Sequence, residues 1–237
     1  MKSRLLLSLG ALLMVAGCAT GPNASPADPF EPLNRQVSRF NDTVDDAVFR
    51  PVATVYRQVL PSPVRTGVNN FFGNLSDVWS FANNVMQLKL QTSAQMFMRV
   101  NVNTFFGLGG LLDIASEAGL DRHSEDFGQT LGYWGVPSGP YLVLPLLGPS
   151  TVRDALALPI DINGDPVNYI NDIPVRNSLY ALRYIDIRSN LLRASQLLED
   201  AALDRYTFIR DAFLQRRRNA IHDGNRNEDG NLKEDDK

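Results

Sequence analysis

Apolar residues recur at spacings of three and four along most of the chain, which is the pattern of amphipathic helices. One helix is predicted over 62–87, because Ser62 can cap it and Pro63 suits the first helical turn. Similar spacing predicts helices over 33–48 and 52–60, and one long or two consecutive helices between 179 and 213. No alternating pattern of convincing length indicates a strand. The sequence therefore predicts a mainly α fold of amphipathic helices in a single domain.

The predicted helix over 62–87 has an unusual polar face. Its polar residues are almost all neutral, whereas a helix face in water normally carries Lys and Glu, which favour helix more than Asn does. A neutral polar face suits a headgroup layer or a wet passage, although packing against an ordinary protein core remains the alternative. The candidate channel-lining residues on this face are Asn69, Asn70, Asn74, Asn83 and Asn84.

Charged residues are unevenly distributed along the chain. The 47 residues of 66–112 contain only Asp77, Lys89 and Arg99, and the 26 residues of 127–152 contain none, although 21% of the whole chain is charged. Surfaces of soluble domains normally mix charges throughout. These two segments are therefore either buried or in contact with something other than water.

Glycine and proline are concentrated in the uncharged segment 127–152. Prolines spaced this closely rule out one continuous helix, and the Tyr and Trp residues between them favour a membrane–water interface. A glycine-rich loop that can move is a candidate gate, while a buried, turn-rich connector is the alternative. The candidate gate residues are Gly128, Gly132, Gly135, Gly139 and Gly148.

The N-terminus has the pattern of a bacterial lipoprotein signal peptide. Two basic residues precede an apolar run from Leu5 to Ala16, which is long enough for a secretory signal and too short to span a bilayer. The run ends at Gly17 and Cys18, the only cysteine in the chain. We predict a signal peptide over 1–17, a covalent lipid on Cys18 and a flexible tether over 18–27. A plain signal peptide with an incidental cysteine is the alternative.

Composition excludes several classes of function. Without Lys2 and Arg4, 21 basic and 26 acidic residues remain, so no excess of positive charge indicates nucleic acid. The glycines of 107–110 fit no phosphate-binding motif. The two histidines, His123 and His222, accompany no nucleophile motif, and they are too far apart in the sequence to indicate a zinc site. We predict no enzymatic activity, no metal and no cofactor beyond the covalent lipid.

Five ordered motifs resemble those of the VacJ/MlaA family of outer-membrane lipoproteins. The similarity covers approximately residues 28–213. The motifs are DPFEPLNR at 28–35, VNNFFGNL at 68–75, GLGGLLD at 107–113, DFGQTLG at 126–132 and GPYLVLP at 139–145.

The resemblance implies a fold and a function. Family members form a helical ring in the inner leaflet of the outer membrane, around a polar channel for phospholipid headgroups. We therefore expect a ring-like, membrane-embedded helical domain over 28–218, followed by a disordered polar tail over 219–237. The expected function is removal of mislocalised phospholipids from the outer leaflet, which maintains lipid asymmetry.

The resemblance also implies partners and a location. The expected partners are phospholipids, a trimeric porin and a periplasmic lipid-carrier protein, and no nucleic acid. The expected location is the outer membrane of a Gram-negative bacterium, with a lipid anchor and embedding from the periplasmic side. A scaffold lipoprotein that organises porins without transporting lipid is the alternative function.

Overall fold

A computed structural model of the 237-residue chain describes residues 28–222. The predicted signal peptide, Cys18 and the tether over 18–27 lie outside the described residues, as does the tail from residue 223 onwards. The last helix ends at Ile221, three residues beyond the boundary expected at 218.

The described chain is mainly helical, as predicted. Its helices and helical turns are α2 (Glu31–Val44), η1 (Asp45–Phe49), α3 (Arg50–Val59), α4 (Ser62–Met86), α5 (Leu90–Phe105), α6 (Ile114–Glu117), α7 (Phe127–Tyr133), α8 (Val152–Gly164), η2 (Pro166–Tyr169), α9 (Ile173–Ala201) and α10 (Arg205–Ile221). One antiparallel hairpin, β1 (Tyr141–Leu144) and β2 (Gly148–Thr151), was not expected from the sequence. Its strands are only four residues long, β1 is apolar throughout and β2 begins with Gly148 and Pro149, so neither shows an alternation of apolar and polar residues in the sequence.

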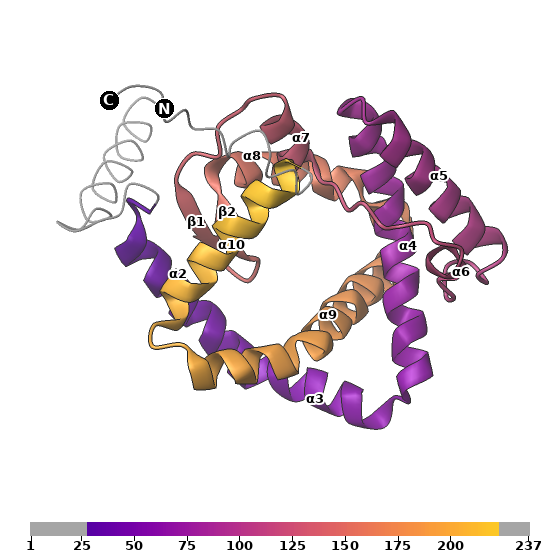
Figure 1. Ribbon diagram of the computed structural model, residues 1–237. Coiled ribbons are helices and arrows are strands. Elements are labelled where there is room, and N and C mark those ends of the chain that lie inside the picture. Colours follow the sequence, from indigo (N-terminus) through magenta and orange to yellow (C-terminus); the bar gives the residue numbers. More distant parts are fainter. Residues whose placement is uncertain (1–27, 223–237) are drawn as a thin grey trace, which may run out of the picture.

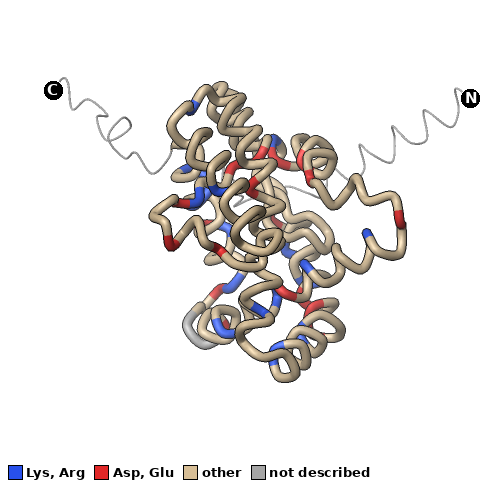
Figure 2. Tube along the Cα trace, turned by 90° about the vertical axis from the view of Figure 1, so that its right-hand side faces the viewer, with Lys and Arg blue, Asp and Glu red and all other residues tan. Residues whose placement is uncertain are grey.

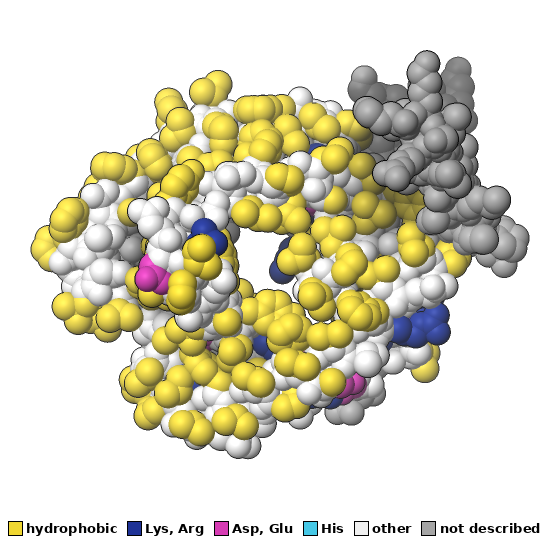
Figure 3. Space-filling model, turned by 180° about the vertical axis from the view of Figure 1, so that it is seen from behind, with side chains coloured by type: hydrophobic (Ala, Val, Ile, Leu, Met, Phe, Trp, Pro, Cys, Tyr) yellow, Lys and Arg dark blue, Asp and Glu magenta, His cyan; other side chains and the backbone are white. Residues whose placement is uncertain are grey.

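The helices are arranged as a ring around a central opening (Figure 1). The helices α2 and α3 form one side, α4 the next, and α7, α8, α10 and the hairpin close the circuit, while α9 lies along α3 and reaches α4. The space-filling view shows that side chains do not fill the opening (Figure 3). The helix α5 packs against α4 on the outside of the ring.

Burial in this ring is inverted relative to a soluble protein. Among the described residues, nine buried residues are hydrophobic and twenty are polar or charged. Large apolar side chains are exposed instead, including Phe105 at 76%, Phe106 at 75% and Leu108 at 70%. Figure 2 shows long stretches of the chain without any charge. An exposed apolar surface this extensive marks contact with lipid or with a partner protein.

The helices predicted separately over 33–48 and 52–60 form one continuous helical segment, which Pro51 does not interrupt. The helices α2 and α3 are joined by the π-helical turn η1, and the residues at both junctions keep right-handed helical torsions. The amide of Arg50 bonds to the carbonyl of Asp45, five residues back, immediately before Pro51. A wider turn at this point accommodates a residue that has no N–H to donate. The chain therefore remains helical from Glu31 to Val59.

Candidate functional site

Three adjoining cavities lie between elements that surround the opening. The α2 pocket, about 380 Å³, lies between α2, the hairpin, α9 and α10. The α4 pocket, about 460 Å³, lies between α4, α7, α8 and α9. The hairpin pocket, about 250 Å³, lies between the hairpin, α8 and α10. It shares Leu147 and Pro149 with the α2 pocket, and Asp126 and Asp161 with the α4 pocket, so the three form one continuous lining.

Ion pairs line these pockets. In the α2 pocket Arg188 binds Asp45 through two hydrogen bonds of 2.6 and 2.7 Å. In the α4 pocket Arg183 pairs with Asp165. Figure 3 shows Lys or Arg side chains at the border of the opening. A lining built from opposite charges is strongly polar but close to neutral, which favours dipolar molecules over simple ions.

An ionic cluster joins α7, α8 and α10 beside the hairpin pocket. Arg217 lies 2.6 Å from Asp126 and 2.8 Å from Asp154, and Arg153 lies 3.0 Å from Asp154. Burial disfavours the charged form of Asp126, but the hydrogen bonds and charge of Arg217 outweigh it and lower the pKa of that carboxyl. Asp126 also caps α7 by accepting a hydrogen bond from the amide of Gln129. The cluster therefore ties three elements of the ring together.

Replacing Gly128 with Ala should disrupt this cluster. A Cβ at Gly128 would lie 2.5 Å from Nη2 of Arg217 and 2.6 Å from Oδ1 of Asp154. Crowding of this kind typically costs about 1–3 kcal/mol of the free energy of unfolding. Gly67→Ala is the matched control in a helix, because its Cβ would meet only Leu111, at 3.7 Å or more. We expect the control to be neutral or stabilising in thermal denaturation. Equal melting temperatures for the two variants would contradict the crowding argument.

Three of the five predicted channel-lining asparagines do not face the opening. Asn74, Asn83 and Asn84 are at most 5% exposed. The Asn74 amide donates to Oγ1 of Thr104 on α5, and Oδ1 of Asn83 accepts from Oγ1 of Thr130 on α7. The channel-lining prediction does not hold for these three, because their side chains are buried between helices and cannot contact a headgroup.

The other two asparagines remain partly accessible. The Asn69 amide donates to Oδ2 of Asp186 on α9, at 3.2 Å, and therefore links α4 to the helix on its inner side. The Asn70 amide donates to the carbonyl of Leu111 in the segment after α5. Of the five predicted residues, only Asn69 lies where α4 meets α9.

The five predicted gate glycines fall into two structural groups. Gly128 and Gly132 lie in α7, where a Cβ would collide with the ionic cluster, so they serve close packing. Gly135, Gly139 and Gly148 have φ between +66° and +89°, which residues with a Cβ rarely adopt. They lie in the hairpin and in the segment leading to it. Only this second group remains a gate candidate.

Two residues that the sequence analysis did not single out hold the hairpin. The Asn34 amide donates to the carbonyl of Tyr141 at 3.0 Å, and its Oδ1 accepts from the amide of Val143 at 2.9 Å. Oδ1 of Asn41 accepts from the amide of Leu146 at 2.8 Å. The asparagines lie seven residues apart on one face of the amphipathic helix α2, and this spacing is the signal that could have revealed them. We call this pair the asparagine clasp.

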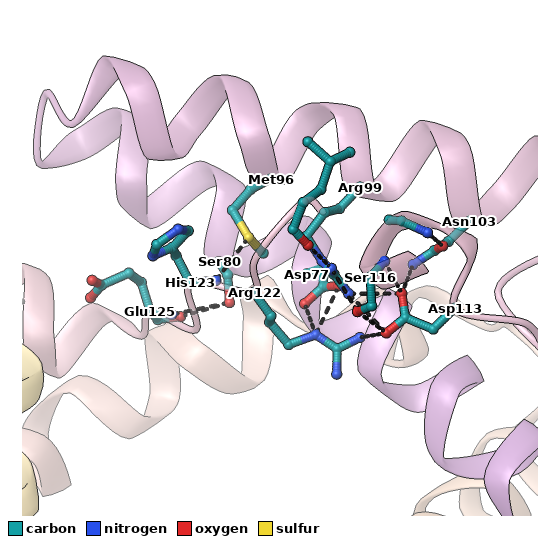
Figure 4. Close-up of polar contacts among 12 residues, drawn as sticks. Asp77, Ser80, Met96, Arg99, Asn103, Asp113, Ser116, Arg122, His123 and Glu125 are labelled. Atoms are coloured by element: carbon teal, nitrogen blue, oxygen red, sulfur yellow. Dashed lines mark hydrogen bonds and ion pairs between the residues drawn. The ribbon is translucent and has the colours of Figure 1, made fainter. Parts of the chain in front are cut away.

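A second ionic cluster lies between α4, α5 and the segment after α5 (Figure 4). Arg99, which is fully buried, bonds to Asp113 at 2.9 and 3.1 Å and lies 3.5 Å from Asp77. Arg122 lies 3.0 Å from the other oxygen of Asp77. This cluster fastens the apolar helix α5 to the ring.

No helix within residues 28–222 is long and apolar enough to cross a membrane. Over the same residues, no group of three or more His, Cys, Asp or Glu side chains could hold a metal ion.

The family model described as MlaA lipoprotein matches residues 26–220 of this sequence. The chain belongs to the MlaA lipoprotein family. The resemblance seen in the motifs is thereby confirmed, and so is the mainly helical, single-domain fold.

Relatives and a solved structure agree with this assignment to the MlaA family. The chain is 35% identical over 229 residues to the intermembrane phospholipid transport system lipoprotein MlaA of Escherichia coli (strain K12), which covers 91% of this chain and 88% of that protein. It is 34% identical over 196 residues to an uncharacterized protein of Rickettsia bellii, covering 82% and 76% of the two chains. A structure solved in work on the structural basis for maintenance of bacterial outer membrane lipid asymmetry matches with a TM-score of 0.72 and 33% identity. That match covers 82% of this chain and 98% of the solved one.

Proposed function

We propose that this protein removes mislocalised phospholipids from the outer leaflet of the outer membrane through the central opening and passes them to a periplasmic carrier protein. The observation that carries the proposal is the inverted burial of the ring: an apolar exterior surrounds an opening with a polar, ion-paired lining. A phospholipid has the same division, with a polar head and apolar tails. Moving it requires a wet passage for the head and breaks no covalent bond.

The apolar exterior also supports embedding in a membrane. Transfer of a fully exposed Phe or Leu side chain out of water contributes about 1.5–3 kcal/mol. Side chains such as Phe105, Phe106 and Leu108 would add this contribution when α5 and the following segment enter lipid. Acyl chains on Cys18 would hold the protein at the membrane in addition. A trimeric porin is the proposed protein partner for part of this exterior.

The hairpin is the proposed gate of the opening. It borders two of the three pockets, and its connections contain the positive-φ glycines Gly135, Gly139 and Gly148. It is held to α2 by side-chain hydrogen bonds of Asn34 and Asn41 rather than by a wider sheet. A two-stranded hairpin depends on such additional contacts for its stability.

The test is the amount of phospholipid in the outer leaflet of cells lacking this protein, measured with a surface-accessible lipid assay. We expect the amount to rise in the deletion strain and to return to normal with the wild-type chain. Cys18→Ser should fail to restore it, because the variant loses its anchor. A substitution on an exposed position, Arg193→Gln, serves as the control and should restore it fully.

An unchanged outer leaflet in the deletion strain, with wild-type protein normally present in the outer membrane, would contradict the transport proposal. That result would favour the scaffold function, in which the ring holds porins and moves no lipid.

A further inference from the structure

The pockets around the opening contain two charged residues without an ion-pair partner among the described residues. Every other Asp, Glu or Arg that lines the three pockets takes part in an ion pair. The exceptions are Asp161 on α8 and Arg216 on α10. Both line the hairpin pocket, whose volume is only about 250 Å³. One small cavity therefore presents a carboxylate and a guanidinium that each lack an ion-pair partner among the described residues.

Asp161 is positioned to receive a cation. Its Oδ1 accepts hydrogen bonds of 2.8 Å from Nε1 of Trp79 and from the amide of Phe127. No hydrogen bond to its Oδ2 occurs among the described residues. Burial raises the pKa of this carboxyl, against the effect of the two donors. A cation beside Oδ2 would offset the cost of burying the charge. The carboxylate is thus fixed by one oxygen and available through the other.

Arg216 provides the opposite charge. It is exposed, follows directly after Gln215 on α10, and lines both the hairpin pocket and a neighbouring cavity that includes Lys89 and Glu125. Arg217 already pairs with two carboxylates, Asp126 and Asp154, so we do not assign it to a ligand. A guanidinium without a carboxylate partner binds phosphate with strong, charge-assisted hydrogen bonds.

The remaining wall of the hairpin pocket is apolar. It is formed by Leu144, Leu147, Pro149, Leu158 and Phe213, and within residues 28–222 its one polar residue besides the charged ones is Ser150. A ligand of this pocket therefore combines a negative group, a positive group and a hydrocarbon part.

We propose that the hairpin pocket binds the headgroup of a zwitterionic aminophospholipid, with its phosphate at Arg216, its primary ammonium at Asp161 and its acyl chains along Leu147 and Phe213. The inference rests on the proposed lipid transport and adds a headgroup preference to it. Phosphatidylethanolamine satisfies both charges at once. Phosphatidylglycerol offers only a phosphate, and it leaves the Asp161 carboxylate without a cation beside an added negative charge.

The experiment compares the two lipids on the purified full chain. The protein in detergent micelles receives an equimolar mixture of phosphatidylethanolamine and phosphatidylglycerol, and native mass spectrometry measures the ratio of the two adducts. We expect the wild type to favour phosphatidylethanolamine about fivefold, as one charge-assisted contact would give. Asp161→Asn should reduce the ratio to about one, since the amide keeps an oxygen for Trp79 and Phe127 but loses the charge. Arg216→Gln should weaken binding of both lipids.

Arg218→Gln is the matched control, because Arg218 lies two residues away on α10, is exposed and lines none of the three pockets. It should leave the ratio and the total binding unchanged. A wild-type ratio near one, or an unchanged ratio in Asp161→Asn with a normal melting temperature, would overturn the inference. Should such a protein still bind both lipids and restore the outer leaflet of deletion cells, the transport function would stand without a headgroup preference. Arg216→Gln gives a second test, and because Arg216 is exposed on α10 this substitution should not disturb folding.

Discussion

Replacing Arg99 with Met is expected to lower the free energy of unfolding by about 3–5 kcal/mol, because it leaves buried carboxylates without their counterion. Arg99 is fully buried and Asp77 is 1% exposed. The Arg99 guanidinium bonds to both oxygens of Asp113, to Oγ of Ser116 at 3.1 Å and to the carbonyl of Leu120. Met fills a comparable volume but satisfies none of these acceptors.

The pKa of Asp77 explains why this position is so sensitive. Burial already raises the pKa of this carboxyl despite the attraction of Arg122 and Arg99. Without Arg99, the ion-pair partner left to Asp77 among the described residues is Arg122, whose side chain is 32% exposed. Urea denaturation in detergent micelles measures the loss of stability. Arg193→Met, on an exposed position of α9 without a described ion pair, should change the free energy by no more than about 0.5 kcal/mol. Similar losses for the two variants would contradict the proposed role of the cluster.

The positions of α2, α3, α4, α9 and α10 could be predicted from the sequence, whereas α5, α7 and α8 were not predicted as helices. The surroundings of each helix face could not be predicted either. The pattern over 62–87 matches α4 (Ser62–Met86) almost residue for residue. Periodicity identifies two faces of a helix without stating which face meets water. In the structure Asn74 and Asn83 on the polar face of α4 bond to neighbouring helices, α5 and α7, while Val78 and Val85 are exposed.

The ion pairs around the opening could not be predicted from the sequence for a related reason. The pockets around the opening are lined by ion pairs between residues far apart in the chain, such as Arg188 with Asp45 and Arg217 with Asp126. These residues read individually as ordinary charges on amphipathic helices. The family motifs, by contrast, were readable because they lie in continuous segments. One of these motifs includes Asn34. Its hydrogen bonds to the hairpin are apparent only in the structure, where β1 lies beside α2.

Removing the asparagine clasp should release the hairpin from the ring. Asn34 is 1% exposed, and its replacement by Ala leaves the amide of Val143 and the carbonyl of Tyr141 without these partners. A buried polar group that loses its partner costs about 1–3 kcal/mol. In Asn34→Ala/Asn41→Ala the cost falls on a two-stranded hairpin whose other support is pairing with β2 and packing of Tyr141 and Val143 against α10. The hairpin should therefore open locally far more often than in the wild type.

Hydrogen exchange of the hairpin amides measures this opening. A local loss of about 1–3 kcal/mol corresponds to exchange about 5- to 150-fold faster at Val143 and Leu146, with no change in α9. Asn101→Ala is the matched control, because the Asn101 amide bonds only to the carbonyl of Phe97 within its own helix. It should leave hairpin exchange as in the wild type. Unchanged exchange in the double variant would mean that pairing with β2 and packing on α10 suffice to hold β1. The asparagine clasp would then not control movement of the hairpin, and the proposal that the hairpin is a gate would lose this support.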